Sequence, residues 1–394
     1  MERISGLEKK YVLEVLDNQF RASQNNLFTA RLETKFAETF HREFAVSFVN
    51  GTATMHTALA VLGVKPGDEV IVPPLTMSSP ALAALHNGSI PVFADVDQKT
   101  FNISPDSILA NITEKTRAVI VVSLYGLAPD YDQILKICRE KGIFLIEDNA
   151  QAFLSRYRGK LVGEFGDFAS FSFQASKHLT CGEGGILVTG SEALADKARQ
   201  FASLGYGSIG AKKGRIARTD IQDPNFDRHI RFGFNYRISE LQAAVALGQL
   251  ERAEELVGVR TKSAGIFNAA IRDIPCLIPQ HTPEGYTNSC WSYSVLLDVD
   301  NPEERWHQFR SLFVKNGGDG IYAAWKPTYQ EPYFQNEVQS YPGIRQKYTR
   351  GLCPNAEYLQ KRMLQFKTNY WNLTEAENQA EILRKTIKDF QHLI

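Results

Sequence analysis

Residues 44–62 read FAVSFVNGTATMHTALAVL, and this stretch decides the fold. The apolar run Phe44 to Val49 has the length of a buried strand, and the helix-like run Thr54 to Leu62 follows after a short Gly/Thr-rich turn. Further strand-length runs come next: Glu69 to Val72, Pro91 to Asp95, Ala118 to Leu124 and Ile143 to Ile146. Helix-like stretches separate several of them. Continuous apolar strands that alternate with helices indicate an α/β fold with a mostly parallel sheet covered on both faces.

The pattern changes after about residue 255. A long helix is predicted from near Ser239 to about Val257, because apolar residues recur there at helical spacing. Beyond it the sequence predicts a strand at Ser292 to Leu297 between further helices. We therefore expect a large α/β domain at residues 28–255, a smaller α+β domain at 256–394, and an N-terminal helix within 1–27 that packs on the smaller domain.

The composition is that of an ordinary globular protein without a strong net charge. The 394 residues are 43% hydrophobic and 22% charged, and 44 Lys and Arg balance 44 Asp and Glu. We therefore expect no nucleic acid and no membrane as a partner. No apolar run is long enough to span a bilayer, and the N-terminus lacks the apolar core of a signal peptide. These features predict a cytoplasmic protein.

The five cysteines are dispersed and include no C-x-x-C pair. An odd, scattered set argues against a disulfide framework and against a zinc or iron–sulfur site. We expect no metal in this protein.

Lys177 is the residue with the most chemical meaning. It follows the strand-like run Asp167 to Phe173, and a Gly-rich segment at 181–185 leads into a second strand-like run, Ile186 to Thr189. A lone lysine in such a place is usually a solvated loop residue. A lysine held in a turn between two apolar strands is also suited to form a Schiff base with an aldehyde cofactor.

Two other segments place polar groups where strands end. Gly51, Thr52 and Ala53 open a helix, so their N–H groups and the Thr52 hydroxyl could hold a phosphate, although such a start is more often a plain cap. Glu147 and Asp148 follow a strand and point to opposite faces, so at most one of them faces a given ligand. The periodicity alone does not say which. Ligands of open α/β sheets collect at these strand ends.

Together these residues match the needs of pyridoxal phosphate (PLP). Lys177 supplies an amine for the aldehyde, and an acid at 147–148 supplies a carboxylate for the pyridine nitrogen. The helix start at Gly51 supplies a phosphate site, to which Ser172 could add a hydroxyl. Gln151 adds an amide near the ring.

Six motifs then resemble the DegT/StrS group of sugar aminotransferases. They are NGTATMHTAL at 50–59, PGDEVIVP at 66–73, EDNAQ at 147–151, GDFASFSFQASK at 166–177, GEGG at 182–185 and NYRISELQAA at 235–244. The resemblance is strong over about residues 25–260 and loose beyond. It implies the fold-type I architecture of PLP-dependent transferases, with a seven-stranded sheet in the large domain and a smaller α+β domain.

The resemblance implies a role for each matched residue. Lys177 would carry the cofactor, Asp148 rather than Glu147 would pair with the pyridine nitrogen, and Gln151 would contact the ring oxygen. Thr52, Ala53 and Ser172 would hold the phosphate. Asn235 would reach the phosphate of a neighbouring subunit, which implies a homodimer with the active site at the subunit interface.

The chain departs from the group on the substrate side. Met77 stands where an aromatic residue often covers the cofactor ring, and a thioether can stack there instead. A frequent histidine is absent from the segment at Cys290 and Trp291, and Ser123 replaces another. These departures leave the cofactor chemistry intact and leave the identity of the sugar open.

Two segments are candidates for substrate contact. The stretch Gly205 to Arg231 is rich in basic residues: Lys212, Lys213, Arg215, Arg218, Arg228, His229 and Arg231. It is either a solvated loop or a clamp for an anionic group, for which arginine is well suited. An aromatic stretch holds Tyr322, Trp325, Lys326, Tyr329 and Tyr333, which either wall a sugar site or pack in the core.

The resemblance implies transfer of an amino group from glutamate to a keto sugar. The sugar is either a nucleotide-linked keto hexose or an acidic keto sugar such as 8-keto-3-deoxy-octulosonate, with an aminocyclitol precursor third. A non-catalytic PLP or sugar sensor of the same fold is the alternative, but it predicts loss of Lys177 or Asp148, and both are present. A nicotinamide enzyme would need a G-x-G-x-x-G turn, which residues 50–54 do not supply.

Overall fold

The computed structural model describes residues 2–20, 27–214 and 218–391. Within these ranges seven strands form one large sheet in the order β1-β9-β8-β5-β4-β2-β3. Their bounds are Phe44–Phe48 (β1), Glu69–Val72 (β2), Ile90–Phe93 (β3), Thr116–Val122 (β4), Phe144–Asp148 (β5), Phe168–Ser172 (β8) and Gly185–Thr189 (β9). Neighbouring strands run parallel except in the pairs that involve β9. The predicted mostly parallel, seven-stranded sheet is therefore confirmed.

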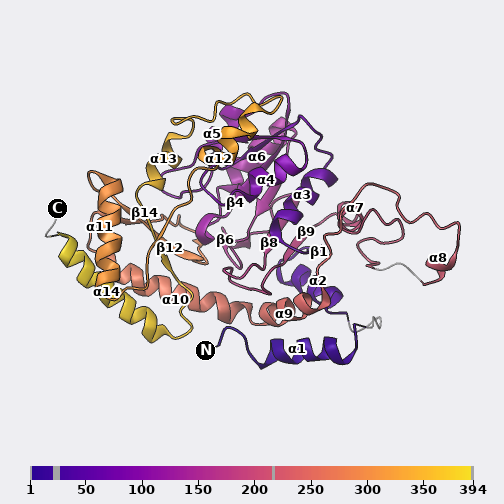
Figure 1. Cartoon of the computed structure of the whole chain (residues 1–394), viewed down its shortest axis with the longest axis horizontal. Coiled ribbons are helices and arrows are strands. Elements are labelled where there is room, and N and C mark those ends of the chain that lie inside the picture. Colours follow the sequence, from indigo (N-terminus) through magenta and orange to yellow (C-terminus); the bar gives the residue numbers. More distant parts are fainter. Residues whose placement is uncertain (1, 21–26, 215–217, 392–394) are drawn as a thin grey trace.

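Helices cover both faces of this sheet (Figure 1). One face packs against α2 (Phe28–Thr39), α5 (Pro105–Asn111), α6 (Tyr131–Lys141) and α9 (Glu240–Glu251). The other packs against α3 (Gly51–Val61), α4 (Ser79–His86) and α7 (Glu192–Ala202). Along β5, Leu145 belongs to the first core and Ile146 to the second. The acids that follow them therefore point to opposite faces as well.

The single helix predicted over 239–257 is wrong, because α9 ends and α10 (Ala253–Ile271) begins around a non-helical residue. Arg252 has φ −110° and ψ 15°, which interrupts the helical backbone. Figure 1 shows α9 and α10 following one another along the lower edge of the molecule. Leu256 packs in a core of the large sheet and Phe267 in a separate core. The expected domain boundary at residue 255 thus falls inside a helix that serves both units.

A second sheet beyond α10 forms an α+β unit. Its strands, in the order β10-β12-β14-β13, are Leu277–Pro279 (β10), Ser292–Leu297 (β12), Met363–Lys367 (β14) and Tyr322–Ala323 (β13). Its core includes side chains from α10, α11 (Pro302–Lys315) and α14 (Leu373–Gln391). Phe267 stacks on Phe366 there at 5.3 Å between ring centroids. A third, small sheet joins β11 (Tyr286–Thr287), β6 (Arg156–Tyr157) and β7 (Lys160–Leu161).

Part of the expected small domain returns to the large sheet. This segment holds η2 (Thr328–Gln330), α12 (Pro332–Asn336), η3 (Val338–Ser340) and α13 (Pro354–Gln360), near the top of Figure 1. The Gln346 side chain accepts from the N–H of Phe93 at 2.7 Å and donates to its carbonyl at 2.8 Å. It therefore satisfies the free edge of β3, and residues 256–394 do not form one separate domain.

The N-terminal helix packs on the large unit, which corrects the expectation that it packs on the smaller one. Helix α1 (Gly6–Asp17) lies against α9 (Figure 1). Glu8 is buried and accepts from the Gln249 amide at 2.5 Å and from Arg252 at 3.0 Å. The Tyr11 hydroxyl donates to Glu251 at 2.8 Å. The buried carboxylate of Glu8 thus fixes this helix beside the α9–α10 junction.

Between α7 and α9 the chain leaves the body of the molecule in an excursion, at the right of Figure 1. Its described part includes α8 (Arg218–Gln222) and two isolated bridges at its base, Ser203 with Asn235 and Tyr206 with His229. A short turn of 3₁₀ helix, η1 (Leu124–Gly126), follows β4 inside the body. In the described ranges, no helix is long and apolar enough to cross a bilayer.

We expect Gly185→Ala to destabilise the protein. A Cβ at this position of β9 would lie 2.6 Å from the carbonyl carbon and oxygen of Asn50, and 2.8 Å from the nitrogen of Gly51. Both are backbone, so the strand or the start of α3 must shift, at about 1–3 kcal/mol. Gly190→Ala is the matched control, because nothing lies within 4 Å of its added Cβ. Thermal unfolding of the two variants checks this, and equal melting temperatures would contradict it.

Candidate active site

Lys177 lies in the loop between β8 and β9, and its backbone is held on both sides. Its N–H donates to the Gln174 carbonyl at 2.9 Å. Its own carbonyl accepts from the guanidinium groups of Arg3 at 3.0 Å and Arg260 at 3.1 Å. The side-chain amine lies 4.9 Å from the centre of the Trp291 ring. The lysine is therefore held in place and is not a solvated loop residue.

The surroundings of Lys177 favour the neutral amine. Burial lowers its pKa to about 8 from an ordinary value of 10.5. The Asp148 carboxylate and, more weakly, Glu183 act in the opposite direction, while the charge of Arg260 adds to the lowering. About a tenth of the amine is therefore neutral, and so nucleophilic, at pH 7, and about half at pH 8.

The structure separates the roles of Glu147 and Asp148. Glu147 is fully buried and accepts five hydrogen bonds: from the Tyr131 hydroxyl, the Asn149 amide and the N–H groups of Gly163, Phe165 and Gly166. Asp148, on the opposite face, accepts from the N–H of Ala150 at 3.0 Å. Burial raises the pKa of Asp148, and the nearby Lys177 opposes that rise. Asp148 is thus the acid left available to a ligand.

The start of α3 forms a polar cradle beside the ends of β8 and β9. Gly51 lies so close to β8 that an added Cβ would be 3.1 Å from the Cβ of Ser172. The hydroxyls of Thr52 and Ser79 contact each other next to it. The Asn50 side chain accepts from the N–H of Ala53 at 2.8 Å, while the first N–H groups of a helix have no acceptor within the helix. This arrangement suits a phosphate.

Gln151 and Ser123 support the turns around this cradle. The Gln151 carbonyl oxygen accepts from the N–H of Tyr125 at 2.9 Å, and the Ser123 hydroxyl donates to Asn149 at 2.7 Å. Tyr125 has φ +59°, which is rare for a bulky residue and marks local strain. Its fully buried ring is nearly parallel to those of Trp325, at 5.8 Å, and Trp291, at 6.4 Å.

The aromatic stretch divides between a cavity and the core. A cavity of about 500 Å³ opens beside the lysine loop and is lined by Ser176, Arg260, Trp291, Tyr322, Trp325 and Lys367, among others. Lys326 is exposed next to it in sequence. Tyr329 is fully buried, and its hydroxyl donates to Glu357 at 2.5 Å and accepts from the N–H of Cys353 at 3.2 Å. The structure therefore gives Tyr329 a packing position, which corrects its expected contact with substrate.

Four of the remaining predicted residues, Met77, His229, Arg231 and Asn235, lie at exposed positions. Met77, in the loop before α4, is 46% exposed. His229, Arg231 and Asn235 are exposed on the excursion, and the His229 ring contacts the Leu204 carbonyl at 2.8 Å. Arg218 begins α8, and Arg215 lies outside the described residues. The segment that carries His229 and Arg231 belongs to the excursion that leaves the body of the molecule at the right of Figure 1.

The sequence pattern of the DegT/DnrJ/EryC1/StrS aminotransferase family matches residues 2–385. The chain belongs to this family. It is 33% identical to GDP-perosamine synthase of Escherichia coli O157:H7 over 341 residues, which cover 86% of this chain and 87% of that protein. Among solved structures, an aminotransferase from Psychrobacter cryohalolentis matches with a TM-score of 0.88 and 27% identity over 98% of both chains. A 3-amino-5-hydroxybenzoic acid synthase matches at 0.85 and 27% identity, over 98% of this chain and 97% of that one.

The chain is thus a sugar aminotransferase that depends on PLP, as the motifs predicted. Its residues fit the cofactor. The cradle at Gly51, Thr52 and Ser172 offers N–H and hydroxyl groups to a phosphate. The buried carboxylate of Asp148 suits a protonated ring nitrogen, and the Lys177 amine suits an aldehyde. The expected fold-type I architecture is confirmed as well.

Sequence reasoning missed three residues around Lys177. Tyr125 and Trp291 form the aromatic wall, and Arg260 holds the loop. Trp291 was noted only as a departure from the family. Arg260 had a signal that was not used: it stands on the apolar face of its helix, between the buried residues Val257 and Ala264. A charged residue in that phase needs a specific partner.

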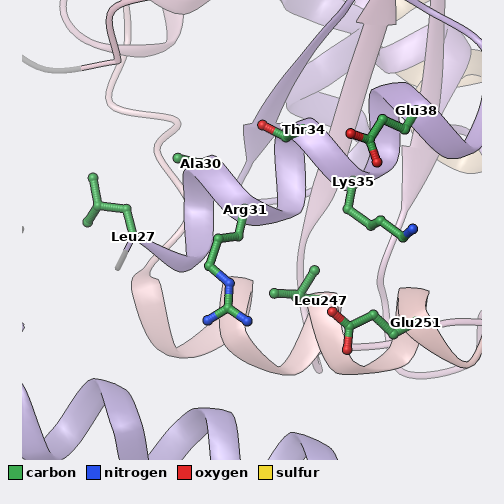
Figure 2. Close-up of a pocket in the computed structure, with 8 residues that line it drawn as sticks. All are labelled: Leu27, Ala30, Arg31, Thr34, Lys35, Glu38, Leu247 and Glu251. Carbon is green, nitrogen blue, oxygen red and sulfur yellow. The ribbon is translucent and has the colours of Figure 1, made fainter. Parts of the chain in front are cut away.

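A further groove and a further cavity are not lined by the residues proposed to bind the cofactor. A groove of about 330 Å³ runs between α2 and α9, where Figure 2 shows Arg31 and Lys35 of one helix beside Leu247 and Glu251 of the other. A cavity of about 970 Å³ lies between strands β10 and β12 of the four-stranded sheet and residues 98–101. Neither is lined by Lys177 or Asp148, so the strand ends remain the active-site candidate.

We expect substitutions of the two neighbouring acids to have opposite effects. Glu147→Gln replaces one accepting oxygen by an NH2 group, which would face either the N–H of Gly163 or those of Phe165 and Gly166, and should destabilise the chain by about 2–4 kcal/mol. Asp148→Asn removes a buried charge, so the stability of the cofactor-free chain should be kept or increased, whereas activity should fall roughly 10²-fold or more. Thermal unfolding and turnover of both variants check this.

The stability of the wild type and of Asp148→Asn should also depend differently on pH. Because folding raises the pKa of Asp148, the cofactor-free wild type loses stability relative to Asp148→Asn as pH rises from below the ordinary aspartate pKa of 3.8. A constant difference in melting temperature from acid to neutral pH would count against a buried, charged Asp148.

Proposed function

We propose that the chain transfers the amino group of L-glutamate to a keto sugar, to make an amino sugar for a cell-surface polysaccharide, a lipopolysaccharide or a related glycoconjugate. The observation that carries this proposal is the buried Lys177 amine with the Asp148 carboxylate nearby. In the net reaction the amino group and the α-hydrogen of glutamate replace the carbonyl oxygen of the sugar. Glutamate leaves as 2-oxoglutarate.

Lys177 carries the proton transfers of this reaction. PLP, when bound, supplies an electron sink for the carbon that loses its proton. The Lys177 amine is neutral in part near pH 8, so it can accept that proton and deliver it to the acceptor carbon. Positioned proton transfer of this kind contributes typically about 10²–10⁴-fold. Asp148 keeps the ring nitrogen protonated.

The other predicted residues hold the cofactor. The first turn of α3, which holds Thr52 and Ala53, binds the phosphate together with Ser172 at the end of β8. The N–H of Ala53 already has the Asn50 side chain as its acceptor. The N–H groups that precede it in the turn therefore contribute most. Gln151 would contact the ring oxygen, and Met77 would stack on the ring. Asn235 reaches the phosphate of the second subunit in a homodimer.

The sugar is a nucleotide-linked keto hexose or an acidic keto sugar such as 8-keto-3-deoxy-octulosonate. The identity to a GDP-perosamine synthase supports the first class. Two departures support the second class: a histidine frequent in relatives is absent from the segment at Cys290 and Trp291, and Ser123 replaces another. Both classes carry an anion, for which we assign Arg218, His229 and Arg231 of the excursion, contributed to the site of the partner subunit. Trp325 and Lys326 form the sugar-facing wall. Such a reaction belongs in the cytoplasm.

A screen of keto sugars with glutamate tests the reaction. We expect release of 2-oxoglutarate with an anionic keto sugar, and loss of that release in Lys177→Ala with retained folding, because no other amine replaces Lys177. Arg231→Gln should raise the KM for the anionic sugar more than it lowers kcat. If only keto sugars without an anionic group react, the assignment of the basic excursion is wrong.

Mixing inactive subunits tests the shared active site. If Lys177 of one chain works with Asn235 of its partner, then Lys177→Ala and Asn235→Asp dimers, each inactive, should regain about a quarter of wild-type activity after subunit exchange in equal amounts. Half of the mixed dimers are heterodimers, each with one intact site. No recovery from a mixture shown by tagged pull-down to contain heterodimers would mean that each site uses a single chain.

A further inference from the structure

Arg260 is a buried cation whose hydrogen-bond partners are all neutral. It is 2% exposed on α10. One terminal nitrogen donates to the Trp291 carbonyl at 2.8 Å and to the Thr368 hydroxyl at 3.4 Å. The other donates to the carbonyls of Ser176 at 3.0 Å and Lys177 at 3.1 Å. Among the described residues, no carboxylate lies within ion-pair distance of it.

Such a residue is unfavourable for folding alone. A buried charge without a counter-ion is strongly penalised, and the Nε of Arg260 has no partner among the described residues. Burial, and then the charge of Arg3, lower the pKa of Arg260 to about 9. An apolar side chain of similar volume would fill the same place with less loss. The arginine therefore needs an explanation beyond packing.

The geometry points to the catalytic lysine. Arg260 joins the lysine loop to the start of β12 at Trp291. The Trp291 indole N–H also donates to the Ser176 carbonyl, at 2.9 Å, and the Lys177 amine lies 4.9 Å from the indole ring. The main chain of the lysine and the ring that receives its amine are thus fixed by the same guanidinium.

We propose that Arg260 is a positioning residue for amino transfer: it fixes the main chain at Ser176 and Lys177 together with the Trp291 indole, so that the lysine amine, whenever it is free, occupies one place over that ring. The amine is free at each proton transfer, so its place decides how efficiently it acts as a base. This role rests on the aminotransferase activity of the family and on no particular sugar.

Charge gives Arg260 a second effect on the same amine. Asp148 and Glu183 favour the protonated lysine, and Arg260 opposes them. Arg3 contacts the lysine carbonyl from the N-terminal arm, and His178 next to it is neutral, because burial and the charge of Arg260 hold its pKa well below the ordinary value. Arg260 is thus the cation, among these groups, that both touches the loop and counters the two acids.

The variants Arg260→Gln and Arg260→Lys separate the two effects, with Arg42→Gln as the control. Arg42 is a partly buried cation with similar hydrogen bonds: it donates to the carbonyls of Glu164 at 3.1 Å and Gly166 at 2.8 Å, has an unpartnered Nε, and does not contact the lysine loop. The Lys177 pKa is measured in the full-length, cofactor-free chain by ¹³C reductive methylation and NMR, with Lys177→Arg to assign the signal. Turnover and melting temperature are measured in the holoenzyme.

For Arg260→Gln we expect the Lys177 pKa to rise from about 8 towards 10.5 and kcat to fall roughly ten- to a hundredfold with little change in KM. Arg260→Lys keeps the charge but cannot reach both the loop and Trp291, so the pKa should stay near 8 while kcat still falls. Arg42→Gln should lower the melting temperature only. If Arg260→Gln also lowers only the melting temperature, the inference fails.

Trp291→Leu keeps the inference testable if Arg260 variants do not fold. It removes the ring beneath the amine and leaves the Trp291 carbonyl, which Arg260 holds, in place. We expect kcat to fall with KM kept, and an unchanged kcat would overturn the inference. The pKa measurement needs no sugar. Failure to find any keto-sugar substrate would therefore count against the proposed function without affecting this titration.

Discussion

The proposed active site depends on placing the Lys177 amine and the Asp148 carboxylate together in a buried setting. Burial alone lowers the pKa of the amine and raises that of the acid, so each group is driven towards its neutral form. Their mutual attraction limits both shifts. The result is an amine that is neutral in part near pH 8, beside an acid whose rise in pKa that amine opposes.

The sheet supplies this pair through strand geometry. β5 and β8 run parallel, so their carboxyl ends meet at one edge, where Asp148 and Ser172 lie near the start of α3. The alternation along β5 turns Glu147 to the other face, where it satisfies backbone groups of the 163–166 turn. The end of β5 thus provides two consecutive acids with different roles: Glu147 stabilises the fold, and Asp148 faces the proposed cofactor site.

The sequence predicted the features that depend on local pattern. The large sheet followed from the apolar runs, and the cofactor chemistry followed from Lys177, the acids and the Gly51 helix start, with the family motifs added. Choosing Asp148 over Glu147 needed the resemblance, because most groups that occupy Glu147, the 163–166 turn and the Tyr131 hydroxyl, are distant from it in sequence. The return of residues 328–360 to β3, and with it the burial of Tyr329, depends on tertiary contacts that no local period encodes.

The excursion between α7 and α9 bears on why the proposed site needs a second chain. Its exposed apolar side chains include Phe232, at 77%, and Ile230, at 54%, next to the exposed Arg231 and Asn235. In a monomer the Phe232 ring is exposed to water, whereas burying such a ring would stabilise the protein by about 1.5–3 kcal/mol. A homodimer that covers this ring would also bring the basic residues over the neighbouring lysine loop. In the proposed homodimer the same contact would stabilise the assembly and add basic groups to the cavity that Arg260 and Lys367 already line.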